Sequence, residues 1–325
     1  MHRFKNILLV CDERGIHDEV IGRAIWLAKA NGATITLVDV VETAPGELAR
    51  TFGALPGARA HDIEIEVLEF HRARVARIAG PIKSEGIETR EIVLQGTAFV
   101  EIIRKVLRGG HDLVMKGAAG EAEGTSRFFG STDLHLLRKC PCPVWIMKKG
   151  RRRKYARLLA AIDLDEGDQQ KDALNTLIMD FATSLSETDG SDLHVMNVWQ
   201  VPEEDTLRNS GFARVSDAEV DALVESKRRH SESKLNELLQ RYPDKGKECH
   251  VHLPKGAARE VIPEFARKQR VELIVMGTVG RTGISGFIIG NTAEAILNQV
   301  ECSVLAVKPP GFNTPVRLAA TAGRA

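Results

Sequence analysis

Short apolar runs alternate with longer amphipathic stretches along the whole chain, in the manner of strands and helices. In the first half the apolar runs predict strands at residues 7–12, 34–41, 89–94, 112–116 and 144–147. The stretches between them predict helices at residues 19–30, about 63–84, 99–107 and from Thr132 onward. Continuously apolar strands are typical of a sheet covered on both faces, and crossover helices favour parallel strands. The pattern therefore predicts an α/β fold built on parallel sheets.

The second half of the chain repeats the text of the first half. Residues 111–117 (HDLVMKG) align without a gap with residues 271–277 (VELIVMG), and residues 142–148 (CPVWIMK) with residues 302–308 (CSVLAVK). The repeat predicts five more strands, near Arg157, Leu193, Glu248, Leu273 and Val304. We expect a first domain at 1–149, a basic linker at 150–156, a second domain at 157–308 and a C-terminal tail at 309–325.

Composition and charge narrow the class of protein. A chain of 325 residues suits two domains of about 150 residues each. Its 45 Lys and Arg against 44 Asp and Glu leave a net charge of +1, which favours neither nucleic acid nor an anionic membrane as partner. Five cysteines without the spacing of a disulfide scaffold indicate a reducing compartment, and the start of the chain reads as neither a signal peptide nor a membrane span. We therefore expect a cytoplasmic protein.

A glycine pattern, G-x2-G-x9-G, follows the fourth predicted strand of each half. Such glycines let backbone N–H groups approach phosphate oxygens, and the helix that follows adds free donors. The alternative is that they serve tight turns only. The residues of this pattern are Gly117, Gly120, Gly130, Ser131 and Thr132 in the first half, and Gly277, Gly280, Gly290, Asn291 and Thr292 in the second.

An aspartate ends the first strand of each half, at Asp12 and Asp163. Ligands of open parallel sheets lie at the carboxyl ends of the strands, where the strand order reverses. If the first and fourth strands are neighbours, each aspartate lies beside its glycine loop and can accept hydrogen bonds from an adenine amine or a ribose hydroxyl. The alternative role is to cap the next helix.

The strand-end aspartate, the glycine pattern and the domain size together resemble the universal stress protein family, over nearly the whole chain and twice. The resemblance implies a five-stranded sheet of order 3-2-1-4-5 in each domain, as in adenine nucleotide alpha hydrolase-like folds. It also implies ATP as the ligand, with Mg²⁺ optional, and two domains paired through their last strands. Base and ribose contacts then fall on Asp12, Val40, Asp163 and Val198, and phosphate contacts on the glycine loops.

The two predicted sites differ in charge. The first loop carries Glu121, Glu123 and Arg127, whereas the second carries Arg281 beside its second glycine. Because a triphosphate is anionic, we expect the second domain to bind ATP more tightly. Lys116 stands where the second half has an apolar residue, and either alters how the base sits or compensates Glu121.

The motifs favour a nucleotide-dependent regulatory module of the stress response, acting with an unknown protein partner. We assign no catalytic residue, because the chain has no Walker lysine and no Ser-His-Asp arrangement. A slow ATPase or phosphotransferase, and a diverged site for another nucleotide-linked or apolar ligand, remain open. Asp133 and His135 have a zinc-like spacing, but residues two apart on a helix do not share a face, so no metal site is assigned. Dimerisation beyond the intrachain pair is open.

Overall fold

The computed structural model describes residues 4–12, 16–42, 60–118, 129–148, 154–164, 169–209, 215–242, 249–278 and 290–318. The first half contains β1 (Asn6–Val10), α1 (Asp18–Asn31), β2 (Thr34–Val41), α3 (Ala60–Ser84), β3 (Thr89–Gln95), α4 (Ala98–Gly109), β4 (Leu113–Gly117), α5 (Ser131–Lys139) and β5 (Val144–Met147). The second half contains β6 (Arg157–Ile162), α6 (Gln169–Asp189), β7 (Asp192–Asn197), α7 (Glu204–Asn209), α8 (Asp217–Leu239), β8 (His250–His252), α9 (Ala258–Lys268), β9 (Leu273–Gly277), α10 (Asn291–Leu297) and β10 (Ser303–Val307).

Local chemistry explains where several helices begin and end. Acidic residues occupy the first turn of α1, where they favour the positive end of the helix dipole. Gly32 closes the same helix in the left-handed conformation, with φ 59°, as the Asn-Gly pair predicts. At the start of α8, Ser216 and Glu219 form a reciprocal capping box.

The ten strands among the described residues form one sheet, in the order β3-β2-β1-β4-β5-β10-β9-β6-β7-β8. Within each half the strands are parallel, and each half has the order 3-2-1-4-5 that the resemblance implied. The order brings β1 beside β4 and β6 beside β9, so the carboxyl ends of the two strands meet within each half. Because β5 and β10 are antiparallel, the meeting point of one half lies on the opposite side of the sheet from that of the other half. This arrangement places each strand-end aspartate next to its glycine segment.

The two halves join through their last strands, which confirms the predicted intrachain pair. β5 and β10 run antiparallel, with Trp145 opposite Leu305 in the register. Both residues are fully buried, so neither strand is left as an exposed edge. On one face of the seam the buried Arg23 Nη1 donates to Asp189 Oδ1 of the other half over 2.7 Å.

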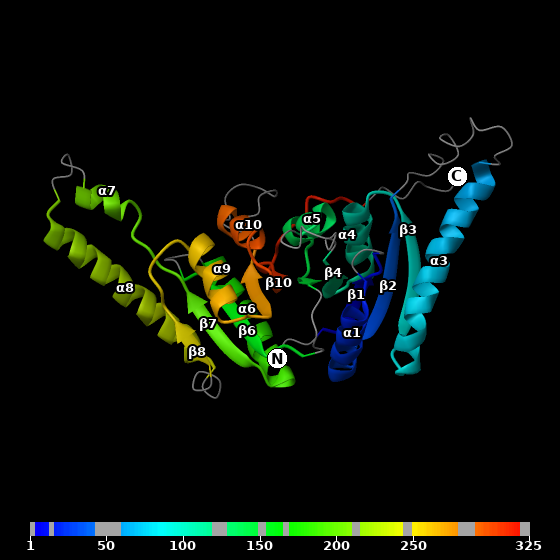
Figure 1. The fold of residues 1–325 in the computed structure, drawn as a ribbon, viewed down its shortest axis with the longest axis horizontal. Coiled ribbons are helices and arrows are strands. Elements are labelled where there is room, and N and C mark those ends of the chain that lie inside the picture. The colour runs from blue at the N-terminus through cyan, green and yellow to red at the C-terminus, as the bar shows by residue number, and fades with distance from the viewer. Residues whose placement is uncertain are drawn as a thin grey trace.

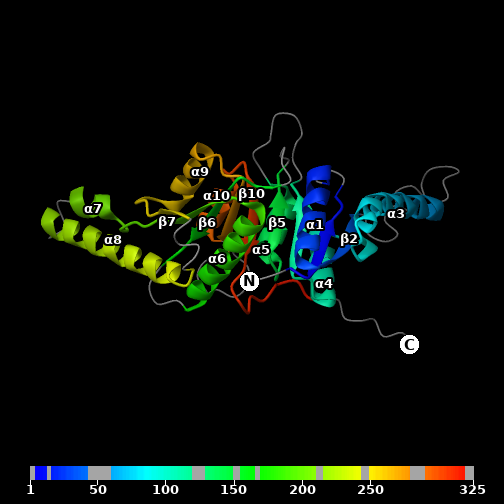
Figure 2. The same cartoon turned by 90° about the horizontal axis from the view of Figure 1, so that it is seen from below.

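Helices cover both faces of the sheet (Figure 1). α1, α3 and α6 pack on one face, while α4, α5, α9 and α10 pack on the other, and each face has a core cluster with members from both halves. α5 and α10 lie beside each other at the centre of the molecule, and α3 and α8 lie at its two ends (Figures 1 and 2). The seam is therefore part of the core rather than a contact between two separate bodies.

The described part of the C-terminal tail, 309–318, contains no helix or strand. It leaves β10, passes the second half and reaches α4 of the first half, where Arg104 Nε donates to the carbonyl oxygen of Arg317 over 3.1 Å. Val316 packs against the core cluster on that face. The tail thus spans both halves as a strap. None of the described helices has both the length and the apolar character needed to cross a membrane.

Candidate functional site

A pocket of about 1340 Å³ lies at the carboxyl ends of β6, β7 and β9 in the second half. This volume exceeds the roughly 300–1,000 Å³ of most small-molecule sites, so a whole mononucleotide can be accommodated. The predicted residues that line it are Asp163, Val198, Gly277, Gly290, Asn291 and Thr292. Two further predicted residues of the same loop, Gly280 and Arg281, lie outside the described residues.

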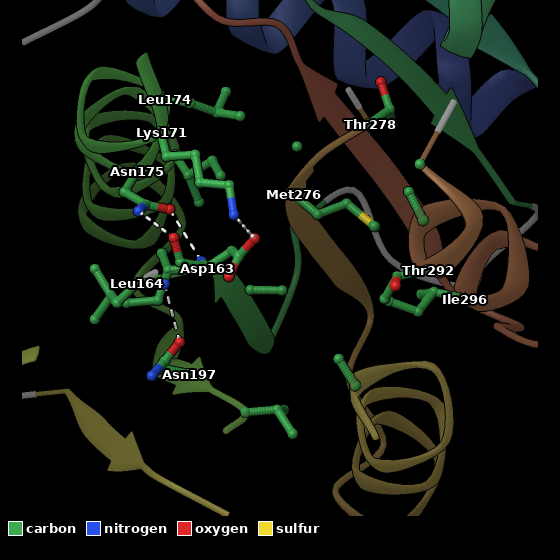
Figure 3. A pocket seen from close by; sticks show the side chains of 18 of the residues that line it. Asp163, Leu164, Lys171, Leu174, Asn175, Asn197, Met276, Thr278, Thr292 and Ile296 are labelled. Carbon is green, nitrogen blue, oxygen red and sulfur yellow. Dashed lines mark hydrogen bonds and ion pairs between the residues drawn. The ribbon is translucent and has the colours of Figure 1, made fainter. Parts of the chain in front are cut away.

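The backbone around Asp163 is held from two elements (Figure 3). The side chain of Asn175, on α6, accepts from Asp163 N over 3.0 Å and donates to Asp163 O over 2.8 Å. Asn197, at the end of β7, accepts from Leu164 N over 3.2 Å. The Asp163 carboxylate itself is 69% exposed and pairs with Lys171 Nζ at 3.0 Å. A rigid backbone therefore presents an accessible carboxylate at the mouth of the pocket.

The opposite wall is formed by β9 and α10 (Figure 3). Met276, Gly277 and Thr278 line the pocket where β9 ends, and Thr292 and Ile296 line it from α10. A Cβ atom on Gly277 would lie 2.7 Å from a methyl group of Leu174, a residue that lines the pocket from α6. The glycine thus allows α6 to approach β9 closely, and its role includes packing as well as any contact with a ligand.

The charged side chains of the lining are mainly basic. The lining has four basic side chains and one carboxylate, that of Asp163; the basic residues are Arg138, Lys171, Lys227 and Arg259. Apolar side chains form other parts of the lining, at Ala161, Leu174, Met276 and Ile296. A lining that is apolar in one part and basic in another suits a ligand with a flat organic group and an anionic group.

The equivalent position in the first half is filled by a buried lysine. Lys116, near the end of β4, forms ion pairs with Asp12 at 3.0 Å and with Asp133 at 2.8 Å. Lys116 is 1% exposed and Asp133 is fully buried. Burial alone would lower the pKa of Lys116, but the carboxylates of Asp133 and Asp12 outweigh it and raise that pKa above its ordinary value. Lys116 is therefore a cation neutralised from both sides.

Aligning the two repeats shows which residues make the ion cluster specific to the first half. Lys116 aligns with Met276 and Asp133 aligns with Ala293, so the second half has neither the cation nor its buried counter-ion. Both Met276 and Ala293 instead line the pocket. Glu121, which the sequence offered as a partner of Lys116, lies outside the described residues; within them the lysine pairs with Asp12 and Asp133.

The other predicted residues of the first half lie around this ion cluster. Gly117 ends β4, Gly130 precedes α5, Ser131 and Thr132 begin α5, and Val40 is partly buried on β2. Gly120 lies outside the described residues. Gly130 N donates to the side chain of Asp133 over 3.0 Å, which fixes the start of α5.

Asp133 and His135, which have a zinc-like spacing, make separate contacts in the structure. His135 stacks on Phe99 of α4, with ring centroids 4.2 Å apart, while Asp133 faces Lys116. In the part of the chain that the structure describes, no group of three or more His, Cys, Asp or Glu side chains is placed to hold a metal ion. The two residues belong to packing and to the ion cluster.

Sequence reasoning missed several residues of the pocket. Lys171 and Asn175 lie on α6, and their contact with Asp163 depends on how that helix packs. Arg138 lines the pocket although it belongs to the first half of the chain. The sequence could have indicated Asn197, because it is a polar residue at the end of an apolar strand, next to Val198. No local pattern indicates Lys171, Asn175 or Arg138.

Comparison with known proteins gives consistent results over the full length. The sequence model of the universal stress protein family matches residues 3–148 and again residues 154–308. Universal stress protein E of Escherichia coli K12 is 28% identical over 98% of both chains, and a homologue of that protein from Haemophilus influenzae is 27% identical over 94% of this chain and 98% of its own.

Solved structures show the same fold. A functionally unknown protein of Pseudomonas aeruginosa PAO1 superposes with a TM-score of 0.68 at 23% identity, over 94% of this chain and 93% of its own. A universal stress protein of Archaeoglobus fulgidus superposes with a TM-score of 0.61 at 18% identity, over 94% of this chain and 97% of its own. The tandem arrangement of two such domains is therefore found in other proteins.

Proposed function

We propose that this chain, which belongs to the universal stress protein family, binds ATP in the pocket of its second domain and acts as a nucleotide-dependent module of the stress response. The observation that carries the proposal is the position of the pocket, which opens where β6 and β9 end side by side, between Asp163 and the first turn of α10. Open parallel sheets bind their ligands at such switch points.

The lining suggests how the nucleotide is oriented. In our proposal Asp163 and the backbone of Val198 contact the base or ribose, next to the apolar side chains of Leu174 and Met276. The phosphates lie against the glycine segment, on the side of α10. The residues that we assign to the phosphates are Gly277, Gly280, Arg281, Gly290, Asn291 and Thr292.

We propose a structural role for the first domain's corresponding site. The Lys116 ammonium group lies between Asp12 and Asp133, where a ligand would otherwise meet the strand-end carboxylate. To hydrogen-bond with Asp12, ATP would have to compete with the ion pair between Asp12 and the buried Lys116, which is costly because a buried cation would lose one of its partners. This supports the ranking in which the second domain is the principal site.

Two measurements test the proposal. Mass spectrometry of small molecules released from the purified protein by denaturation should identify an adenine nucleotide. Isothermal titration calorimetry of the emptied protein should then give one ATP bound per chain. Nucleotide binding would be refuted if the released molecule belongs to another chemical class and its binding depends on Asp163. It would also be refuted if ATP at millimolar concentration produces no heat of binding. Its regulatory role would be tested by whether ATP changes which proteins the chain binds in a cell extract.

A further inference from the structure

The last turn of α5, in the first domain, forms part of the wall of the second domain's pocket. Arg138 lies in this turn and lines the pocket, whereas the other lining residues come from the second half of the chain. Its guanidinium group pairs with Glu294 in the first half of α10. A residue of one domain is thereby fixed against the phosphate side of the proposed site in the other.

Further contacts from the second domain hold this turn in place. The carbonyl oxygen of Leu137 accepts from Thr278 Oγ1 over 2.9 Å and from Lys308 Nζ. Thr278 follows Gly277 directly and lines the pocket, and Lys308 follows β10. Burial lowers the pKa of Lys308 to about 7. The segment that begins the glycine loop and the last turn of α5 therefore behave as one packed unit.

The guanidinium group of Arg138 has donors left for a ligand. Nη2 pairs with Glu294, while Nε is buried and has no hydrogen-bond partner within the described residues. A buried N–H group without a partner is costly, and an anion beside it would remove that cost. Because the side chain is 27% exposed, solvent and ligand can still reach the group.

The arrangement is not reproduced on the other side of the pseudo-twofold axis. In the repeat, Arg138 aligns with Asn298 and Glu294 aligns with Leu134, so the second domain offers no equivalent arginine to the first. The ion pair is therefore specific to the domain that has the open pocket. The ion pair with Glu294 would be enough to join the halves, so it does not by itself account for the position of Arg138 in the pocket lining.

We infer that Arg138 is a cross-domain contact for the anionic group of the ligand, so that the nucleotide site of the second domain is complete only with a residue of the first. The inference rests on the proposed nucleotide function and extends it, because it assigns a phosphate contact outside the glycine loop. Arginine suits the role through its planar fork of donors, which can serve Glu294 and a phosphate at the same time.

The test compares ATP with adenosine by isothermal titration calorimetry on the full chain. Arg138→Met should weaken ATP binding about tenfold, the effect of losing one charge-assisted contact, and should leave adenosine binding unchanged. Arg108→Met, in the last turn of α4, removes the same charge and should change neither affinity. Arg138→Lys keeps the charge, and should weaken ATP binding less than Arg138→Met.

A second variant separates ligand contact from a bridge between the domains. Glu294→Gln breaks the same ion pair but leaves the guanidinium group in place, so ATP affinity should not fall. Equal losses in Arg138→Met and Glu294→Gln, or equal losses for ATP and adenosine, would overturn the inference while leaving nucleotide binding intact. If the unmodified chain binds neither ATP nor adenosine, the proposed function fails, and the inference fails with it.

Discussion

Asp163 combines an exposed carboxylate with a backbone held by Asn175, which is the arrangement that our proposed ligand contact requires. We expect Asp163→Ala to weaken ATP binding about tenfold, because one hydrogen bond to the charged group is lost. The midpoint of thermal unfolding should hardly change, since an exposed ion pair contributes little to stability.

Calorimetric titration and thermal unfolding of the same preparation check both parts of this prediction. Asp12→Ala is the matched control, because Asp12 ends the equivalent strand but pairs with the buried Lys116. ATP affinity should be unaffected in that variant. An Asp163→Ala protein with wild-type affinity would return Asp163 to the helix-capping role.

His194 makes the second domain sensitive to acid. It is 8% exposed and stacks on His250 and His252 of the edge strand β8, with ring centroids 4.9 and 5.2 Å apart. Burial, and then the neighbouring histidines, lower its pKa to about 4, while Asp192 opposes and Arg157 adds to the shift. The folded protein therefore holds this ring neutral at pH values where an unfolded chain would protonate it.

The sign of the pH effect follows from that difference. Between pH 6.5 and about 4 the unfolded state binds a proton at residue 194 that the folded state does not bind, so the free energy of unfolding falls as the pH falls. Urea unfolding of His194→Gln should show a shallower decline over this range than the wild type. His17→Gln, in the first domain, serves as control, and parallel curves for wild type and His194→Gln would contradict the prediction.

At the scale of elements, the end of β4 and the start of α5 decide how the strand-end carboxylate of the first domain is paired. Lys116→Met leaves the buried Asp133 carboxylate without its lysine, and should lower the free energy of unfolding by about 3–5 kcal/mol. Adding Asp133→Ala removes the stranded charge and copies the residues of the second domain. The double variant should therefore recover much of the lost stability, although Gly130 N loses its acceptor.

Urea unfolding measures this pair of effects, and the non-additivity of the two substitutions gives the coupling between the charges. Asp133→Ala alone leaves Lys116 paired with Asp12, so its cost should be smaller than that of Lys116→Met. If the cost of the double variant equals the sum of the two single-variant costs, Lys116 and Asp133 do not stabilise each other, and the prediction is wrong.

Most of the elements could be predicted because buried parallel strands are written in the sequence as continuous apolar runs. The predicted strand at 34–41 has the bounds of β2, and the strand expected near Glu248 is β8, His250–His252. The hydrophobic pattern did not predict α7 and α8 as separate helices. One reason is that α8 lies at the end of the molecule and buries few residues, so its apolar pattern is weak. Strand order could be predicted only through the family resemblance, since pairing is a property of the whole sheet.

The candidate site was predictable only where it is local. Asp163 and the glycines of the second half lie at positions that a motif can mark, whereas Val198 was assigned only through the family resemblance. Those of these residues that the structure describes line the pocket. Lys171 reaches the site from the next helix, and Arg138 from the other domain, so no spacing in the sequence indicates them. Lys116 was noticed as a departure, but its partner Asp133 depends on how α5 packs beside β4.

At the scale of the whole molecule, one continuous sheet joins two halves that differ in the residues at their strand ends. The antiparallel pairing of β5 with β10 and the buried pair Arg23–Asp189 fix the halves to each other on the sheet and on one of its faces. Because Thr278 and Lys308 both hold the last turn of α5, occupation of the pocket is mechanically connected to the first domain. The first domain thereby contributes structural support and one lining residue, Arg138, to the pocket of the second domain.

The difference between the domains predicts that the ion cluster of the first domain can be built into the second by substitution. Met276→Lys with Ala293→Asp gives the second domain the lysine and the aspartate of the first domain's ion cluster, with Asp163 as the third member. The new lysine should pair with both carboxylates and occupy the pocket, and ATP binding should fall by more than tenfold. Met276→Leu with Ala293→Ser changes the same positions without adding charge, and should keep most of the affinity.

Combining this transplant with Lys116→Met and Asp133→Ala should move the remaining ATP binding to the first domain, where Asp12 would no longer be paired with Lys116. Binding there should be weaker than in the wild type, because Asn298 cannot supply the contact that we assign to Arg138. Calorimetry gives the affinity and stoichiometry, and Asp12→Ala in the fourfold variant shows which domain holds the nucleotide. Wild-type affinity in the Met276→Lys, Ala293→Asp protein would mean that ATP does not use the space beside β9, and the asymmetry between the domains would need another cause.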